Sequence, residues 1–205
     1  MNIVRFTDTV DRLRSLARFR REDMPISAKV GLTVAAAALT GLAAQNRIPL
    51  PFTPVPATGQ VFAVLLSGAL LGAAWGGASQ LLYVGLGAAG VPWFSGWAAG
   101  LPFGPTAGYL LGFVPAAAFV GWASERFAGA RSFVPQVFLM LCAVGIIYLF
   151  GAIGFSATTG AGLKTTLALA VAPFIAVDCA KAAAAAAISS ALTAEKSPRP
   201  DTRDE

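Results

Sequence analysis

The stretch "VFAVLLSGALLGAAWGGASQLLYVGL" (61–86) contains no charged residue and is apolar along nearly all of its length. A helix that crosses a bilayer needs about 20 consecutive, mainly apolar residues. Glycines gather near the middle of the stretch, in "GAAWGG" (72–77), where they favour a tight turn. The pattern therefore predicts two membrane-spanning helices, at 58–72 and 75–90, joined by a short turn.

The region free of charge extends well beyond this hairpin. No charged residue lies between Arg47 and Glu125, which leaves room for three spans. The whole chain is 56% hydrophobic and only 12% charged, whereas soluble domains are about 25% charged. We therefore expect an all-α integral membrane protein. A nucleic-acid partner is not expected, because that function needs a basic face on a soluble surface.

Apolar segments and loops alternate along the rest of the chain. Two loops stand out, a proline-rich one at 47–59 and one rich in glycine, proline and aromatic residues at 90–106. Four prolines in the first loop exclude a helix and favour a stiff, extended path. With the hairpin, the chain is predicted to have six spans, the other four lying at 27–45, 106–124, 133–155 and 174–194.

The basic residues predict the orientation in the membrane. Seven of the 15 Lys and Arg lie in the first 29 residues, and three more lie near the C-terminus. Because basic residues concentrate on the cytoplasmic side, we expect both termini in the cytoplasm and both long loops outside. The predicted organisation is a cytoplasmic basic segment (1–26), a six-helix transmembrane domain (27–194) and a cytoplasmic tail (195–205).

The N-terminal segment allows two interpretations. Apolar residues such as Phe6, Val10 and Leu13 recur at helical spacing among the bases, which fits an amphipathic helix on the anionic leaflet. A disordered basic tail fits equally well. A cleaved signal peptide is disfavoured, because the basic region is long and many spans follow it.

Motifs for catalysis or nucleotide binding are weak. The chain has no histidine, the commonest general base and metal ligand. "GLGAAG" (85–90) lacks the strand, helix and acid of a dinucleotide site, and "GAGLKTT" (160–166) lacks the glycine before the lysine of a P-loop. Glu125 is expected at a solvated helix end, and Cys142 and Cys179 are expected to be free and buried. We predict no enzyme activity, no catalytic residue, no ATPase within this chain, no metal and no cofactor.

Two charges interrupt the last span, "FIAVDCAKAAAAAA" (174–187). Asp178 and Lys181 are three residues apart and therefore share a helix face. Each would cost about 2.5–3.5 kcal/mol at the bilayer centre, so we expect them to face the bundle interior or a polar cavity. They form either an internal ion pair or part of a ligand site. Pro173 favours the ligand site, because it breaks the helix and can free backbone groups for binding.

Small residues on the first span form a face that allows close helix approach. Taken alone, this face favours packing within the bundle over docking of another membrane protein. The face comprises Ala36, Ala37, Thr40, Gly41 and Ala44.

From about residue 48 to residue 187 the chain resembles the BioY family, the biotin-binding S components of energy-coupling factor (ECF) transporters. Departures are modest: Gly59 stands where the family often has Leu, and Ala176 and Val177 stand where Pro-Gly is common. The turn "GAAWGG" also lacks a basic residue often found there. Four motifs carry the resemblance: "PFTPVPATGQVFAVLLSGALLG" (51–72), "LLYVGLGAAGVPWFSG" (81–96), "GPTAGYLLGF" (104–113) and "PFIAVDCAKAAAAA" (173–186).

The resemblance implies a six-helix S-component bundle in the bacterial inner membrane. Such a protein captures biotin outside the cell and delivers it to the cytoplasm. The implied partners are a transmembrane coupling protein and two cytoplasmic ATPases, although a solitary or homo-oligomeric form is the alternative. With such a partner, the small-residue face of the first span would become a docking surface.

The resemblance also implies which residues contact biotin. Asp178 can accept a hydrogen bond from a ureido N–H, and Lys181 can neutralise the carboxylate or donate to a carbonyl. Gln60 can both donate and accept a hydrogen bond. For the aromatics the alternative is a membrane-interface belt, which explains the mid-span Tyr83 least well. The remaining expected ligand contacts are Tyr83 and Trp97, with possible pocket walls at Trp93, Tyr109 and Phe52. The rival functions are an S component for another vitamin and a structural or assembly protein with an internal Asp–Lys pair.

Overall fold

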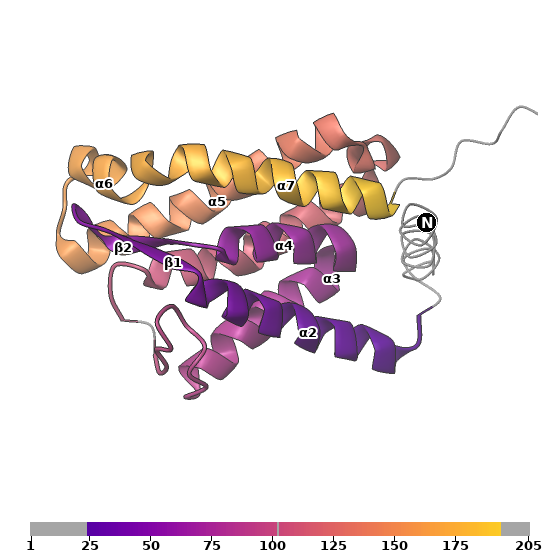
Figure 1. The fold of residues 1–205 in the computed structure, drawn as a ribbon, viewed down its shortest axis with the longest axis horizontal. Helices are drawn as coiled ribbons and strands as arrows, with labels where there is room; N and C mark the ends of the chain where they lie inside the picture. Colours follow the sequence, from indigo (N-terminus) through magenta and orange to yellow (C-terminus); the bar gives the residue numbers. More distant parts are fainter. Residues whose placement is uncertain (1–23, 102, 194–205) are drawn as a thin grey trace, which may run out of the picture.

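The computed structural model describes residues 24–101 and 103–193 as a bundle of apolar helices. The basic N-terminal segment, predicted to be either an amphipathic helix or a disordered tail, and the C-terminal tail lie almost wholly outside these residues. The elements run in the order α2 (Ile26–Gln45), β1 (Arg47–Leu50), β2 (Thr53–Thr58), α3 (Gln60–Ala88), α4 (Ala107–Arg126), η1 (Ala128–Arg131), α5 (Phe133–Thr159), α6 (Leu163–Ala170), η2 (Ala172–Phe174) and α7 (Ile175–Thr193) (Figure 1).

Helix α3 turns back on itself at Gly72. The backbone there has φ 86° and ψ −178°, a conformation that glycine adopts readily and other residues rarely do. Beyond the turn, Gln80 Nε2 donates to the hydroxyl of Ser67 over 3.0 Å. In a straight helix these two residues would be about 20 Å apart. Helix α3 is therefore a helical hairpin, and it reverses at the start of the segment predicted to turn.

Within the described residues, five helical segments are long and apolar enough to cross a membrane: 26–45, 60–88, 107–126, 133–159 and 163–193. The six spans predicted from the sequence are not confirmed by this count of five, in which the two arms of α3 are counted as one helix. The predicted spans otherwise agree with the observed helices to within a few residues. Between α5 and α7 the short helix α6 was not predicted as a separate element.

The hairpin packs against both α2 and α4, and α4 packs against α5. Glycines allow the closest approaches: a Cβ on Gly121 of α4 would overlap the backbone of Gly72. Glu125 of α4 accepts a hydrogen bond from the backbone N–H of Ala73 over 3.2 Å. Glu125 is exposed, as predicted for a helix end, and its hydrogen bond to Ala73 also holds the turn of α3 in place.

The proline-rich loop is extended, as predicted, and it pairs with itself. Strands β1 and β2 are antiparallel, with Arg47 opposite Thr58 and Leu50 opposite Thr53. In a two-stranded ribbon both strands are edges, so prolines need not break a ladder hydrogen bond. The N–H of Gly59 donates to the carbonyl of Ala43, which ties the ribbon to the end of α2.

The loop between α3 and α4 is held by one side chain of α2. Gln45 Nε2 donates to the carbonyls of Trp93 (3.1 Å) and Phe94 (3.0 Å), and Gln45 Oε1 accepts from the N–H of Trp97 (3.0 Å). The loop therefore lies beside the β1–β2 ribbon, at the end of the bundle opposite the Gly72 turn.

The small-residue face of α2 lies mostly inside the bundle, as its composition alone favours. Ala37, Thr40, Gly41 and Ala44 are buried within the bundle, and only Ala36 is partly exposed. Small side chains allow α2 to lie close to α3 and Trp93, so the face packs within the bundle, and its docking of a partner protein stays a prediction. One prediction about buried residues is corrected: Cys142 and Cys179 were expected to be buried, but both are free and exposed, on α5 and α7.

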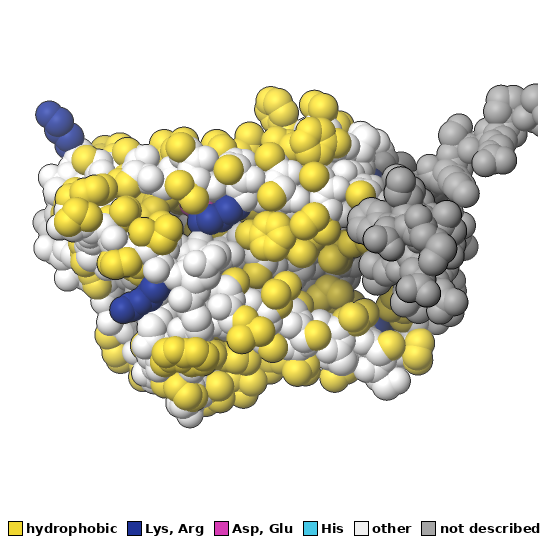
Figure 2. All heavy atoms as spheres, in the orientation of Figure 1, with side chains coloured by type: hydrophobic (Ala, Val, Ile, Leu, Met, Phe, Trp, Pro, Cys, Tyr) yellow, Lys and Arg dark blue, Asp and Glu magenta, His cyan; other side chains and the backbone are white. Residues whose placement is uncertain are grey.

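The outer surface of the bundle is hydrophobic. Figure 2 shows hydrophobic side chains spread over the visible face, with few basic ones among them. Large apolar side chains are exposed on α2, α5 and α7, among them Leu42, Phe138, Leu149, Ile153 and Ile188. An apolar surface this continuous fits contact with lipid and not with water.

Candidate ligand-binding site

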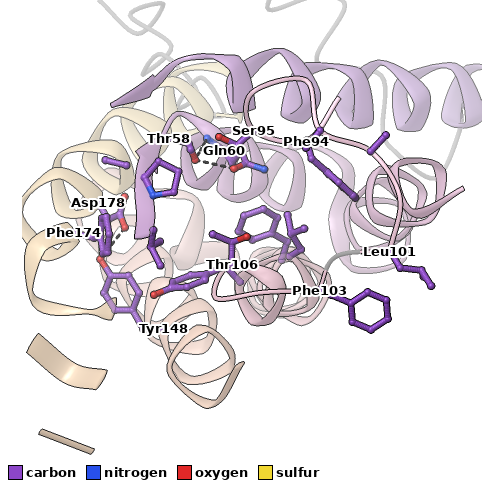
Figure 3. Close-up of a pocket in the computed structure, with 18 of the residues that line it drawn as sticks. Thr58, Gln60, Phe94, Ser95, Leu101, Phe103, Thr106, Tyr148, Phe174 and Asp178 are labelled. Carbon is purple, nitrogen blue, oxygen red and sulfur yellow. Dashed lines mark hydrogen bonds between the residues drawn. The ribbon is translucent and has the colours of Figure 1, made fainter. Parts of the chain in front are cut away.

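A cavity of about 270 Å³ opens between the β1–β2 ribbon, the loop after α3 and the start of α7 (Figure 3). This volume lies close to the lower end of ligand pockets, roughly 300–1,000 Å³. Its lining comes from β2, the first residue of α3, the α3–α4 loop, α4, α5, η2 and α7. Segments far apart in the sequence thus build one site at one end of the bundle.

One cluster of polar side chains in the cavity is centred on Asp178, which is only 4% exposed. Lys181 Nζ donates to its Oδ1 over 2.8 Å, and the hydroxyl of Tyr148 donates to its Oδ2 over 2.8 Å. The break at η2, which contains Pro173, lets α7 begin at Ile175. Asp178 therefore lies in the first turn of α7, where the helix dipole stabilises a carboxylate.

A second polar group is centred on Gln60, which is buried as the first residue of α3. Its Oε1 accepts from the hydroxyl of Thr58 (2.9 Å), and its Nε2 donates to the hydroxyl of Tyr83 (2.8 Å). The Tyr83 hydroxyl donates in turn to the carbonyl of Trp93 over 3.4 Å. These contacts fix the orientation of the amide and leave its second N–H for a ligand.

The remaining walls are mainly apolar and aromatic. Phe94 and Phe113 are buried, and the ring of Phe94 meets Tyr83 edge-on with centroids 5.4 Å apart. Tyr109 places its ring in the wall, while its hydroxyl donates to the carbonyl of Ala170. Aromatic walls with a few fixed polar groups are typical of small-molecule sites.

The structure brings together four of the eight residues that the sequence pointed to as ligand contacts or pocket walls. Asp178, Lys181, Gln60 and Tyr109 line the cavity. The other four are absent from its lining, and each has another position. Tyr83 and Trp93 lie behind the wall, where the Trp93 indole N–H donates to the Tyr83 carbonyl over 2.9 Å, whereas Trp97 and Phe52 are 63% and 57% exposed.

Sequence reasoning missed Tyr148 and the short polar residues of the lining. Tyr148 had a signal, because it is one of only three tyrosines and lies within the apolar "IIYLF" (146–150). Thr58, Ser95 and Thr106 had none, since short polar residues in loops are common and unremarkable. Only the fold shows that these three face the same cavity.

The arrangement suits binding of a small, mostly apolar molecule with polar groups. Asp178 and Lys181 neutralise each other, so the cavity has no net charge from this pair. A carboxylate oxygen has two lone-pair sites and an ammonium has three donors, so both groups can still bond to a ligand.

Comparison with known proteins agrees with this description. The family model described as the BioY family matches residues 15–197. The probable biotin transporter BioY of Methanothermobacter thermautotrophicus is 42% identical over 137 residues, covering 62% of this chain and 87% of that protein. The probable biotin transporter BioY of Pyrococcus horikoshii is 37% identical over 166 residues, covering 80% of this chain and 95% of that protein.

A solved structure is also similar. It is a crystal structure of the S-component for biotin from an ECF-type ABC transporter, with a TM-score of 0.75 and 25% sequence identity. The match covers 82% of this chain and 94% of that one. The family model spans most of the sequence, and the solved structure shares its fold; this chain therefore belongs to the BioY family.

Proposed function

We propose that this chain is the membrane-embedded subunit that binds biotin and takes part in its uptake. The observation that carries the proposal is the cavity, in which an acid, a base and an amide face apolar walls. The two relatives described above, which this chain matches over most of their length, are named probable biotin transporters. The similar solved structure is an S-component for biotin.

The chemistry of biotin fits this cavity. Biotin has a ureido group with two N–H donors and a carbonyl, an apolar bicycle and tail, and a terminal carboxylate. Asp178 can accept from a ureido N–H through a lone pair that Tyr148 and Lys181 leave free. Lys181 can neutralise the carboxylate with a donor that Asp178 does not use, and the aromatic walls suit the apolar bicycle.

The proposed topology is six membrane crossings with both termini in the cytoplasm. The two arms of α3 count as two crossings, and α6 with α7 as one. Glu125 bonds to Ala73, so the Gly72 turn and the end of α4 lie at the same end of the bundle as Arg126 and Arg131. Because basic residues favour the cytoplasmic side, this end faces inward and the cavity opens outward.

The proposed location is the bacterial inner membrane, as a transmembrane domain over residues 27–194 flanked by cytoplasmic ends. The proposed partners are a transmembrane coupling protein and two cytoplasmic ATPases. What supports them is the likeness to an S-component of an ECF-type ABC transporter. These partners would supply the energy for transport.

A binding titration tests the proposed function. Protein purified in detergent should bind biotin with nanomolar affinity, and Asp178→Asn should weaken binding greatly while the protein stays folded. A suitable control is Ser190→Ala, which alters a partly exposed residue near the end of α7 that does not line the cavity. If the protein bound a different vitamin and not biotin, the proposed substrate would be wrong, although the chain would still belong to the family. If Asp178→Asn bound biotin normally, the Asp–Lys pair would have only a structural role.

A further inference from the structure

The hydroxyl of Ser95 lines the cavity without a hydrogen-bond partner among the residues that the structure describes. Its Oγ is buried, and Figure 3 shows Ser95 at the same side of the cavity as Thr58 and Gln60. A buried hydroxyl with no partner costs free energy, so it is uncommon without a role.

Three of the four buried serines inside the described helices differ from Ser95, and the fourth, Ser124, lies near the end of α4. The hydroxyls of Ser67, Ser79 and Ser189 each donate to a backbone carbonyl three residues earlier in their helix, at 2.8, 2.7 and 3.2 Å. Ser95 lies in a loop, so it has no preceding helical turn to bond to. Its hydroxyl therefore stays free to bond to a molecule in the cavity.

The backbone around Ser95 is held in place on both sides. The carbonyl of Phe94 accepts from Gln45, the N–H of Phe94 donates to the carbonyl of Ala98 over 3.0 Å, and the N–H of Trp97 donates to Gln45. A ligand contact from Ser95 would therefore need little reorganisation, which favours affinity.

Ser95 and Gln60 are linked through a shared neighbour. The Tyr83 hydroxyl accepts from Gln60 and donates to the carbonyl of Trp93, two residues before Ser95. One uncharged network thus fixes the amide of Gln60 and the backbone near Ser95, and this network does not include the charged pair on α7.

We infer that the Ser95 hydroxyl hydrogen-bonds directly to the bound ligand and contributes to its affinity. This inference rests on the proposed function and adds a contact residue to it. The serine hydroxyl carries no charge and its backbone is already held in place, so its contribution to the binding free energy should be that of one neutral hydrogen bond.

The test compares Ser95→Ala with a matched control, Ser124→Ala. Ser124 also has a buried Oγ without a partner among the described residues, but it lies near the end of α4 and does not line the cavity. Both variants remove a buried, unpartnered hydroxyl, so without biotin each should unfold at the wild-type temperature or slightly above it. In biotin titrations Ser95→Ala should bind about 2- to 10-fold more weakly, and Ser124→Ala should bind as the wild type does.

A second variant, Ser95→Cys, has a slightly larger side chain but only a weak donor, so its affinity should fall between those of the wild type and Ser95→Ala. Wild-type affinity in Ser95→Ala would overturn the inference, and so would equal weakening in Ser95→Ala and Ser124→Ala. A large loss of unfolding temperature in Ser95→Ala without biotin would show a structural partner and would also overturn it. Failure of the wild-type protein itself to bind biotin would instead reject the proposed function, so the two failures are distinguishable.

Discussion

The hydroxyl of Tyr148 on α5 donates a 2.8 Å hydrogen bond to Oδ2 of Asp178 on α7. Lys181 occupies the other carboxylate oxygen. The acid is therefore held from two sides by two different helices, and its orientation in the cavity depends on both.

Tyr148→Phe should weaken biotin binding by about tenfold or more. The variant removes a hydrogen bond to a charged group, which contributes about 1.5–3 kcal/mol, and frees the carboxylate to rotate away from the ligand. Titration calorimetry measures the affinity. Tyr109→Phe is the matched control, because it also removes a lining hydroxyl but one that bonds to a backbone carbonyl. A Tyr148→Phe affinity equal to that of Tyr109→Phe would argue against a special role for the Asp178 bond.

Lys181→Met should destabilise the protein and abolish tight binding. It leaves Asp178 buried without its cation, and breaking a buried ion pair costs about 3–5 kcal/mol. The double variant Asp178→Asn with Lys181→Met should regain most of that stability and should still fail to bind. Thermal unfolding in detergent, with and without biotin, separates the two effects. Tight binding by the double variant would show that the pair only holds the bundle together.

Gly72→Ala should lower the stability of the fold by about 1–3 kcal/mol. The φ of 86° with ψ near 180° is a region that residues with a Cβ rarely occupy. Gly31→Ala in α2 is the control, since a Cβ there meets no atom within 4 Å and alanine favours a helix. Thermal unfolding measures both. Because the turn lies at the end opposite the cavity, the folded fraction of Gly72→Ala should keep its affinity for biotin.

Labelling with a membrane-impermeant maleimide tests the proposed topology. In a Cys142→Ala, Cys179→Ala background, Ala98→Cys in the α3–α4 loop should react in intact cells. Gly129→Cys in η1 should react only after the membrane is opened. Both positions are exposed in the structure. Biotin should also protect Ala98→Cys, because Ala98 lines the cavity. The opposite labelling pattern would reverse the orientation.

Trp97→Ala should change biotin affinity by less than about twofold, although the sequence pointed to Trp97 as a ligand contact. Its side chain is 63% exposed and lies outside the lining, while Gln60 is buried and lines the cavity. Gln60→Ala should therefore weaken binding clearly more than Trp97→Ala does in the same titration. A strong effect of Trp97→Ala would mean that the loop closes over the ligand.

The sequence predicted the charged pair, the helical turn and the extended proline-rich segment because each depends on local chemistry. A charge in a span must avoid lipid, and four prolines in one loop cannot form a helix. Glycine at a turn supplies the conformation that other residues avoid, as at Gly72. These features need no knowledge of the neighbouring helices.

The sequence did not show which face of each helix points inward. The spans are apolar on all sides, since lipid and protein interior both accept apolar side chains, so no polar stripe marks the outer face. For that reason Cys142 and Cys179, which were expected to be buried, are exposed.

The sequence by itself determined that this protein is a membrane bundle with an acid and a base in its last span. Only the tertiary structure decided that Tyr148 and Lys181 hold Asp178, and that Ser95 and Gln60 lie in the same cavity. These residues come from different elements, and their meeting depends on how the helices are rotated and packed. Helix rotation is set by close contacts such as that of Gly121 with Gly72, which involve residues distant in the sequence.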